Sequence, residues 1–156
     1  MKKIYLMRHG LAPTSAEAGV ASDALRPLSD RGRRDARLMA AEILRRGGRP
    51  SLVLHSPLLR ALQTASAAAP ALRAGLEAFP PLDNTRPPAE ALAAIEKRAA
   101  AVDELLAVGH QPQIGELAAL LTGTIHEIRP AGIVAVEWAP RPRLLWTLNV
   151  DELEPR

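Results

Sequence analysis

The 156-residue chain contains no cysteine, which excludes disulfide bonds, thiol catalysis and thiolate metal sites. Aromatic residues are scarce, and one Tyr, one Phe and two Trp leave little surface on which nucleic-acid bases could stack. The sequence has no run of about 18 apolar residues, so we expect no transmembrane helix. The apolar stretch after the initial Met-Lys-Lys is too short for the core of a signal peptide, and we expect a cytoplasmic protein.

Charge and composition are those of an ordinary globular protein. Hydrophobic residues make up 47% and charged residues 24% of the chain, with a formal net charge of +3, which argues against disorder and for one compact domain. The arginine clusters at 31–37 and 43–49 lie in or beside a helical pattern that also contains Asp35 and Glu42. We interpret them as a solvated helix face, and we expect neither nucleic acid nor a membrane as a partner.

Strand patterns and helix patterns alternate along the chain. Apolar positions at Ala36, Met39, Ala40, Ile43 and Leu44 recur at helical spacing. A helix is predicted there, with Ser29 as its N-cap and Gly47-Gly48 as its end. In the same way, Ser56 is predicted to cap the next helix, with Pro57 at its first position. The predicted strands are 3–8, 51–55, 76–79, 104–110, 132–139 and 143–150, and the remaining predicted helices are 56–69, 88–101 and 112–121.

This order predicts an α/β fold. Strands that alternate with helices form a mostly parallel sheet covered on both faces, and the last two strands are predicted to form an antiparallel hairpin around Pro-Arg-Pro-Arg. The result is a single three-layer α/β/α domain. Open sheets of this kind bind ligands at the carboxyl ends of their strands.

Three strand ends carry the same kind of chemistry. The first strand ends at Arg8-His9-Gly10, the second leads into a helix with Arg60 in its first turn, and the fourth ends at Gly109-His110. Two arginines, two histidines and a helix N-terminus at one sheet edge would bind a doubly charged tetrahedral anion, which indicates phosphate. Each residue alone also has a structural interpretation, as a surface helix residue or the last residue of a strand.

Other classes of site fit the sequence less well. The four histidines, His9, His55, His110 and His126, show no helical ligand spacing, so we expect no metal and no cofactor. His55 is interpreted as a strand end and His126 as a loop residue. The chain lacks a G-x-S-x-G elbow and a G-x-x-x-x-G-K-[ST] loop, which disfavours acyl transfer and P-loop nucleotide hydrolysis.

Four segments together resemble the histidine phosphatase superfamily, also called phosphoglycerate-mutase-like, over about residues 3–150. They are "LMRHG", "RPLSDRGRRDA", "SPLLRALQTA" and "AVGHQPQIGEL". The short length and "ASDALRPLS" are more similar to its small branch, the SixA-type phosphohistidine phosphatases. The resemblance implies one histidine-phosphatase-like domain over residues 1–156. It also implies that His9 is the nucleophile, that Arg8, Arg60 and His110 bind phosphate, and that the Gly10 backbone orients the imidazole.

The resemblance also bears on the substrate. Superfamily members that cleave alcohol phosphates usually carry a carboxylate that protonates the leaving oxygen. Candidates here are Asp23, Asp83 and Glu90, and each also has a structural interpretation, in a loop, in a turn or at a helix start. An imidazole departs far more readily than an alkoxide, so a dedicated acid is less necessary for it, and a protein-borne phosphohistidine is the favoured substrate.

Three hypotheses stay open: a phosphohistidine phosphatase acting on a partner protein, a phosphatase of small phosphomonoesters, and a phosphate-binding module without turnover. A mutase is the least favoured interpretation. Leu11 departs from the polar or acidic residue that relatives often carry after the RHG motif, and it could alter the rim of the site. Arg26 could also lie near this rim.

Overall fold

The computed structural model describes residues 1–153, which form one α/β unit around a six-stranded sheet. The strands are β1 (Lys3–Arg8), β2 (Leu52–His55), β3 (Gly75–Ala78), β4 (Glu104–Gly109), β5 (Ile133–Glu137) and β6 (Arg143–Leu148). The α-helices are α1 (Ser15–Ala18), α2 (Asp30–Arg45), α3 (Leu59–Leu72), α4 (Pro88–Arg98) and α5 (Gln113–Thr122). Short 3-10 turns lie at Asp23–Leu25, Pro80–Leu82 and Val150–Glu152.

The sheet is mostly parallel, with strand order β3-β2-β4-β1-β5-β6. Strands β1 to β4 pair in parallel, whereas β5 runs antiparallel to both β1 and β6. The predicted α/β class and the antiparallel C-terminal hairpin are confirmed. In the register of the central pair, Arg8 lies opposite Gly109, so β1 and β4 end together.

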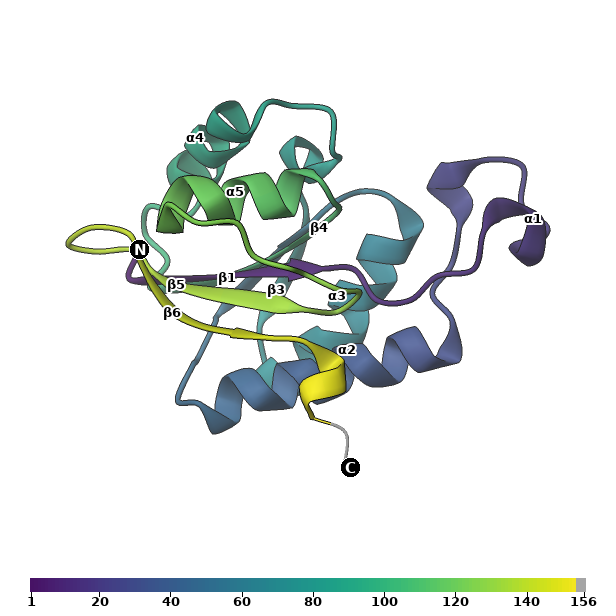
Figure 1. Cartoon of the computed structure of the whole chain (residues 1–156), viewed down its shortest axis with the longest axis horizontal. Coiled ribbons are helices and arrows are strands. Elements are labelled where there is room, and N and C mark those ends of the chain that lie inside the picture. Colours follow the sequence, from purple (N-terminus) through teal and green to yellow (C-terminus); the bar gives the residue numbers. More distant parts are fainter. Residues whose placement is uncertain (154–156) are drawn as a thin grey trace.

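Helices cover both faces of the sheet (Figure 1). Successive residues of β1 point to opposite faces, as in any strand. Tyr5 and Met7 are buried in the core under α2 and α3, and Ile4 and Leu6 are buried in the core under α4 and α5. The interior therefore consists of two apolar layers separated by the sheet, and none of the described helices is both long and apolar enough to cross a membrane.

The predicted stripe of the second helix is confirmed, as is its N-cap. Ser29 Oγ accepts a hydrogen bond from the Gly32 N–H at 3.0 Å, and Gly47 follows the helix with φ at +86°. Glycine adopts such a conformation without strain, which ends the helix at the predicted place.

Several predicted boundaries differ from the observed ones by one to three residues. The short helix α1 lies in a stretch predicted as loop, where Thr14 and Glu17 form a reciprocal capping box. Helix α4 ends at Arg98 rather than near residue 101. The prediction that Ser56 caps α3, with Pro57 at its first position, is wrong, because the helix begins at Leu59 and its N-cap position is Leu58.

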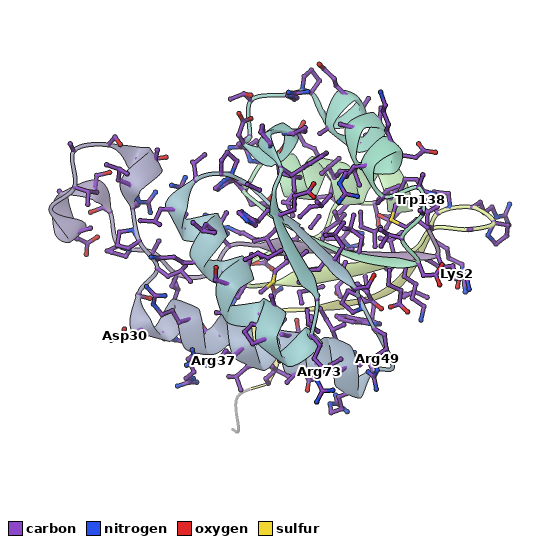
Figure 2. All side chains as sticks on the ribbon, turned by 180° about the vertical axis from the view of Figure 1, so that it is seen from behind. Lys2, Asp30, Arg37, Arg49, Arg73 and Trp138 are labelled. Carbon is purple, nitrogen blue, oxygen red and sulfur yellow. The ribbon has the colours of Figure 1, made fainter. Side chains whose placement is uncertain are left out.

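The two ends of the sheet differ in surroundings. Lys2 and Trp138 lie at the end where β1 begins, and Asp30, at the start of α2, lies at the opposite end (Figure 2). Figure 1 shows α1 and the turn that follows it extending away from the body at this second end. The carboxyl ends of the parallel strands, where ligands are expected, lie there as well.

Candidate active site

His9 and His110 lie side by side at the carboxyl edge of the sheet. Each residue directly follows a strand, β1 for His9 and β4 for His110, and these two strands are paired in register. The two ring centroids are 5.2 Å apart, with an angle of 57° between the ring planes. Residues 101 positions apart in the sequence are thus brought together by the parallel pairing, as the order of elements predicts.

The backbone of the next residue fixes the orientation of the His9 ring. His9 Nδ1 lies 2.7 Å from the Gly10 carbonyl oxygen, and because a carbonyl can only accept, Nδ1 carries the hydrogen. Nε2 is then unprotonated, and it accepts a hydrogen bond from Arg60 Nε at 3.3 Å. The lone pair of Nε2 therefore points toward the guanidinium.

Gly10 itself is held by close packing. Its N–H donates to Thr64 Oγ1 at 3.0 Å, and the Thr64 hydroxyl donates in turn to the Arg60 carbonyl at 2.7 Å. A Cβ at Gly10 would lie 2.8 Å from the backbone oxygen of Gly32 in the first turn of α2, which is too close for a real contact. This position therefore requires glycine so that the backbone of α2 can approach the loop that carries His9.

Arg60 is the second residue of α3 and is only 7% exposed. Besides the bond from Nε to His9, one terminal nitrogen donates to the Asp23 carbonyl at 2.9 Å and the other to Asp23 Oδ2 at 3.0 Å. All three guanidinium nitrogens are therefore held in one geometry, which is the arrangement that suits bidentate recognition of an anion.

Arg8 ends β1 and is half-buried. One terminal nitrogen donates to the Ile128 carbonyl at 3.1 Å, whereas its buried Nε has no hydrogen-bond partner among the described residues. Burial lowers the pKa of this guanidinium from its ordinary value, and its charge contributes to lowering the pKa of His9. Arg8 thus adds a second positive charge within electrostatic range of the His9 ring.

Both histidines are neutral at pH 7. Burial is the main cause that lowers the pKa of His9 to about 3, and the nearby His110, Arg60 and Arg8 add to the effect, while the bond to Gly10 opposes it. Burial also lowers the pKa of His110 to about 4, again with a contribution from Arg60. Two cations around neutral imidazoles make a site that can bind an anion and attack it with a nitrogen lone pair.

Ser56 also lies in this group of side chains, although the sequence predicts it as the N-cap of the following helix. Its hydroxyl oxygen lies 2.7 Å from His110 Nε2 and accepts a bond from the Leu58 N–H at 3.2 Å. Both side chains are buried, with Ser56 fully inaccessible and His110 2% exposed. Ser56 therefore fixes the His110 ring rather than the start of α3.

Of the three candidate acids, only Asp23 contacts the predicted site residues. Its carboxylate bonds Arg60 and also Arg26, whose NH1 lies 3.0 Å from Oδ1. The hydrogen bonds from Arg26 and Arg60 lower the pKa of this carboxyl group. Asp83 Oδ1 instead accepts from the backbone and hydroxyl of Thr85, and Glu90 is exposed in the first turn of α4.

The other two histidines lie outside this group. His55 is buried at the end of β2, with Nδ1 2.8 Å from the Ser56 carbonyl oxygen, and His126 Nε2 lies 2.8 Å from the Thr122 hydroxyl. Among residues 1–153, no three His, Asp or Glu side chains gather in a way that could hold a metal ion.

Two sequence comparisons relate this chain to known proteins. Residues 4–86 match the family model of the histidine phosphatase superfamily (branch 1). An uncharacterized protein of Picosynechococcus sp. is 36% identical over 140 residues, which span 86% of this chain and 84% of that protein.

Solved structures share the whole fold. The protein histidine phosphatase SixA, complexed with tungstate, superposes with a TM-score of 0.86 at 27% identity, covering 97% of this chain and 99% of that one. The alpha-ribazole phosphatase of Shigella flexneri superposes with a TM-score of 0.74 at 17% identity, covering 95% of this chain and 96% of that one. The second likeness is one of fold alone.

Proposed function

Because the chain belongs to the histidine phosphatase superfamily and is a phosphatase, we propose that it removes the phosphoryl group from phosphohistidine on a partner protein, with His9 as nucleophile. Arg8, Arg60 and His110 are proposed to bind the phosphoryl oxygens. The SixA structure that resembles this chain holds tungstate, a tetrahedral oxyanion, which supports a phosphate pocket in this fold.

One observation carries the proposal most directly. The unprotonated Nε2 of His9 faces the Arg60 guanidinium at 3.3 Å, while Nδ1 is fixed on the Gly10 carbonyl. An oxyanion bound to Arg60 would therefore lie next to a nitrogen lone pair that is already oriented. With the pKa of His9 at about 3, this nitrogen needs no base to become nucleophilic at neutral pH.

In the first step, His9 Nε2 forms a bond to phosphorus as the bond from phosphorus to the substrate imidazole breaks. The substrate ring leaves as a neutral imidazole after its other nitrogen has taken up a proton from solvent, so no protein group has to protonate the leaving nitrogen. The guanidiniums of Arg8 and Arg60 offset the negative charge on the phosphoryl oxygens, which would otherwise repel the lone pair. His110 lies 5.2 Å across from His9, where its ring can contact the same group.

In the second step, water attacks phosphorus on His9. The new P–O bond forms as the bond to Nε2 breaks, both water hydrogens leave with the phosphate, and the neutral ring of His9 is restored. The bond from Nδ1 to Gly10 persists through both steps, so the ring does not need to turn between them.

The leaving group indicates the substrate class. An alkoxide leaves only when it is protonated, and a carboxyl group that donates this proton must hold it near neutral pH. Asp23 is the only candidate acid bonded to Arg60, and Arg26 and Arg60 lower its pKa. Its carboxylate is a poor acid, which favours a substrate whose leaving group needs no proton from the protein.

The second candidate function is hydrolysis of small phosphomonoesters. It is favoured by the position of Asp23, because its carboxylate already reaches the arginine proposed to bind phosphate. Binding of a dianion could displace this carboxylate and raise its pKa, which would make it an acid after all.

The two functions are separated by initial rates of phosphate release from a phosphohistidine peptide and a phosphomonoester at neutral pH, with His9→Ala as the blank. We expect the N–P substrate to be strongly preferred and Asp23→Asn to retain most of that activity. Comparable O–P hydrolysis that is lost in Asp23→Asn would support the second function. A burst of phosphate release in a single turnover would exclude a binding module, and near wild-type activity in His9→Ala would contradict the mechanism. A cytoplasmic location stays a prediction.

A further inference from the structure

Four hydrogen bonds form a closed ring through His9. His9 Nδ1–H donates to the Gly10 carbonyl at 2.7 Å, and the Gly10 N–H donates to Thr64 Oγ1 at 3.0 Å. The Thr64 hydroxyl donates to the Arg60 carbonyl at 2.7 Å, and Arg60 Nε donates to His9 Nε2 at 3.3 Å. The ring therefore joins the loop after β1 to the first two turns of α3 and includes both ring nitrogens of His9.

Thr64 is the member of this ring that the proposed mechanism does not use. It lies one turn after Arg60 in α3 and is fully buried, so it can act on the reaction only through the groups that it bonds. A threonine hydroxyl can donate one hydrogen and accept others. Donation to the carbonyl four residues earlier is common in helices, whereas accepting the N–H of Gly10, 54 residues away, links α3 to the loop that carries His9.

The bond from Gly10 matters because glycine turns easily about its own backbone bonds. The close approach of Gly32 requires glycine at this position, and the same residue supplies the carbonyl that orients the His9 ring. Two hydrogen bonds hold the peptide between His9 and Gly10. Its carbonyl accepts the Ala131 N–H at 3.1 Å, and its N–H donates to Thr64. Removing the hydroxyl would leave this buried N–H without a partner and the peptide held on one side alone.

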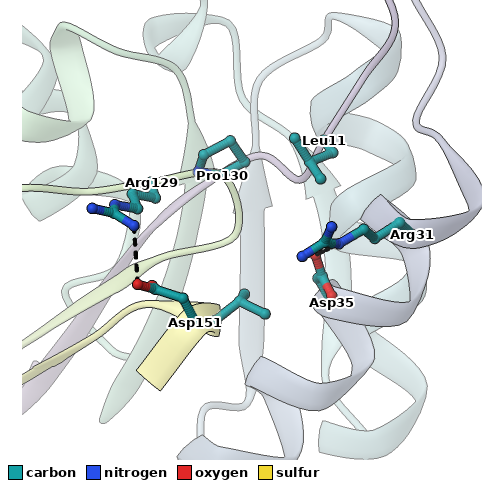
Figure 3. A pocket seen from close by; sticks show the side chains of 7 residues that line it. Leu11, Arg31, Asp35, Arg129, Pro130 and Asp151 are labelled. Atoms are coloured by element: carbon teal, nitrogen blue, oxygen red, sulfur yellow. Dashed lines mark hydrogen bonds and ion pairs between the residues drawn. The ribbon is translucent and has the colours of Figure 1, made fainter. Parts of the chain in front are cut away.

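The chain beyond Gly10 borders a small cleft of about 170 Å³. Leu11 lines one side of it, and the ion pair of Arg129 and Asp151 lies across from Leu11 (Figure 3). The Leu11 side chain is 38% exposed, so it is not fixed in the core. Packing on this side of the loop is therefore too loose to replace a lost bond from Gly10 to Thr64.

The guanidinium of Arg60 depends less on the Thr64 hydroxyl. Its two terminal nitrogens donate to the carbonyl and the carboxylate of Asp23 at 2.9 and 3.0 Å, and these bonds do not involve Thr64. Loss of the hydroxyl should therefore leave the guanidinium in place to bind an anion while the His9 ring loses its fixed orientation. Anion binding and the chemical step would then be affected unequally.

We propose that Thr64 is a positioning residue for phosphoryl transfer. Its hydroxyl holds Gly10, and through Gly10 it keeps the His9 ring in register with Arg60. The inference rests on the proposed function, in which His9 is the nucleophile, and it applies to both candidate substrate classes. Nε2 must lie in line with the bond that breaks at phosphorus, and a ring that turns freely spends less time in that orientation. Thr64 therefore contributes to kcat rather than to substrate binding.

Three variants test this role. Thr64→Val removes the hydroxyl and keeps a similar shape, Thr64→Ser keeps the hydroxyl, and Thr122→Val is the matched control. Thr122 lies in α5 and also donates to the carbonyl four residues earlier, that of Ala118, at 2.8 Å. Its other side-chain partners in the described part of the chain are Thr124 and His126, so this control loses the same kind of helix bond outside the ring.

Kinetics separate positioning from binding. Initial rates are measured with a phosphohistidine peptide and with p-nitrophenyl phosphate, and the Kd of inorganic phosphate is measured by titration. We expect Thr64→Val to lower kcat by about 10- to 100-fold, as for a slightly misplaced reacting group. KM and the phosphate Kd should stay within about threefold of the wild-type values. Thr64→Ser should keep kcat within about threefold of the wild type, and Thr122→Val should change neither kcat nor KM.

The Nδ1 hydrogen of His9 reports the orientation of the ring without turnover. Its bond to the Gly10 carbonyl should make it exchange slowly with solvent in the wild-type protein. In Thr64→Val, NMR should show it exchanging at least about tenfold faster while the amide hydrogens of β1 stay protected. Should Thr64→Val fail to fold, Thr64→Ala removes the hydroxyl without placing a methyl group against the Gly10 N–H.

The inference is overturned if Thr64→Val keeps kcat within about threefold of the wild type, or if kcat and phosphate affinity fall together. It is also overturned if Thr64→Ser is as impaired as Thr64→Val, or if neither hydroxyl-free variant folds, because Thr64 would then serve stability alone. Wild-type turnover tests the proposed function separately. Hydrolysis of p-nitrophenyl phosphate alone would refute phosphohistidine as the substrate and leave Thr64 to be judged on the ester. A wild-type protein inactive on both substrates would refute both proposals.

Discussion

Lowering the pH from 7 to 5 is expected to destabilise the folded protein through His9 and His110. Their pKa values are held at about 3 and about 4, in each case mainly by burial, whereas a histidine in an unfolded chain titrates near about 6.5. Between these values the unfolded chain binds protons that the folded site rejects. The free energy of unfolding therefore falls as the pH decreases. The contribution of each ring to the free energy of unfolding is fully present above the pKa that histidine has in the unfolded chain. It is lost as the pH falls toward the pKa of the ring in the folded protein.

The size of the effect follows from the two pKa values. Between pH 7 and pH 5, each ring is expected to lower the free energy of unfolding by about 2 kcal/mol, or about 4 kcal/mol for both. The total stability of a domain is on the order of 5–15 kcal/mol, so this loss is large. At pH 5 both pKa values still lie below the solution pH, so the folded site keeps its neutral rings while the histidines of the unfolded chain are protonated.

Urea denaturation at pH 7 and pH 5 measures this loss directly in the wild-type protein. The double variant His9→Gln, His110→Gln is the control, because it keeps polar side chains but removes both titrating rings. The wild-type protein should lose about 3–4 kcal/mol more than the double variant between the two pH values. An equal loss in both proteins would refute the argument, since the acid sensitivity would then arise elsewhere in the chain.

Four further changes test the site. Arg60→Lys should lower kcat/KM by about 10²–10³. A single ammonium group cannot bond the His9 ring and at the same time bind an anion through two parallel hydrogen bonds, as a planar guanidinium can. A change of less than about threefold would contradict this. Ser56→Ala should reduce stability by about 1–3 kcal/mol and slow turnover, since it leaves His110 Nε2 buried without a partner. Unchanged urea midpoints and rates would show that the hydroxyl is dispensable. Gly10→Ala should destabilise the protein by about 1–3 kcal/mol through its clash with the backbone of α2, and a wild-type melting temperature would show that the loop can move aside. Chelation and dialysis should leave phosphohistidine hydrolysis unchanged, as expected for a cationic site, and a loss restored by added metal would contradict the metal-independent mechanism.

The overall fold was predictable because its signals are local and repeated. Each parallel strand is a short apolar run, and the stripe from Ala36 to Ile43 has the helical period. Once strands and helices alternate, the handedness and layering rules leave few arrangements. The same rules placed His9 and His110 at one edge, because residues that follow parallel strands lie together whatever their separation in the sequence.

The start of α3 could not be predicted from local patterns. Ser56 followed by Pro57 has the composition of a helix start, and both residues favour that position. In the structure the hydroxyl instead meets His110 at 2.7 Å, a residue 54 positions away, and the helix begins later. A contact between two strand ends decided the role of this serine, and no local pattern records such a contact.

The contacts of Asp23 bear on two alternatives that the sequence leaves open. In the sequence, an aspartate in a loop near the site can be a proton donor or a structural residue. In the structure its carboxylate lies 3.0 Å from nitrogens of both Arg26 and Arg60, and a carboxylate bonded to two guanidiniums gives up its proton readily and regains it poorly. The same contact helps hold Arg60, whose Nε bonds His9 at 3.3 Å. A carboxylate that must stay charged to bond the arginine proposed to bind phosphate cannot at the same time serve as the neutral acid. The chemistry that this site supports in its free state is therefore transfer from leaving groups that need no proton from the protein, and an imidazole protonated by solvent on its other nitrogen is such a group.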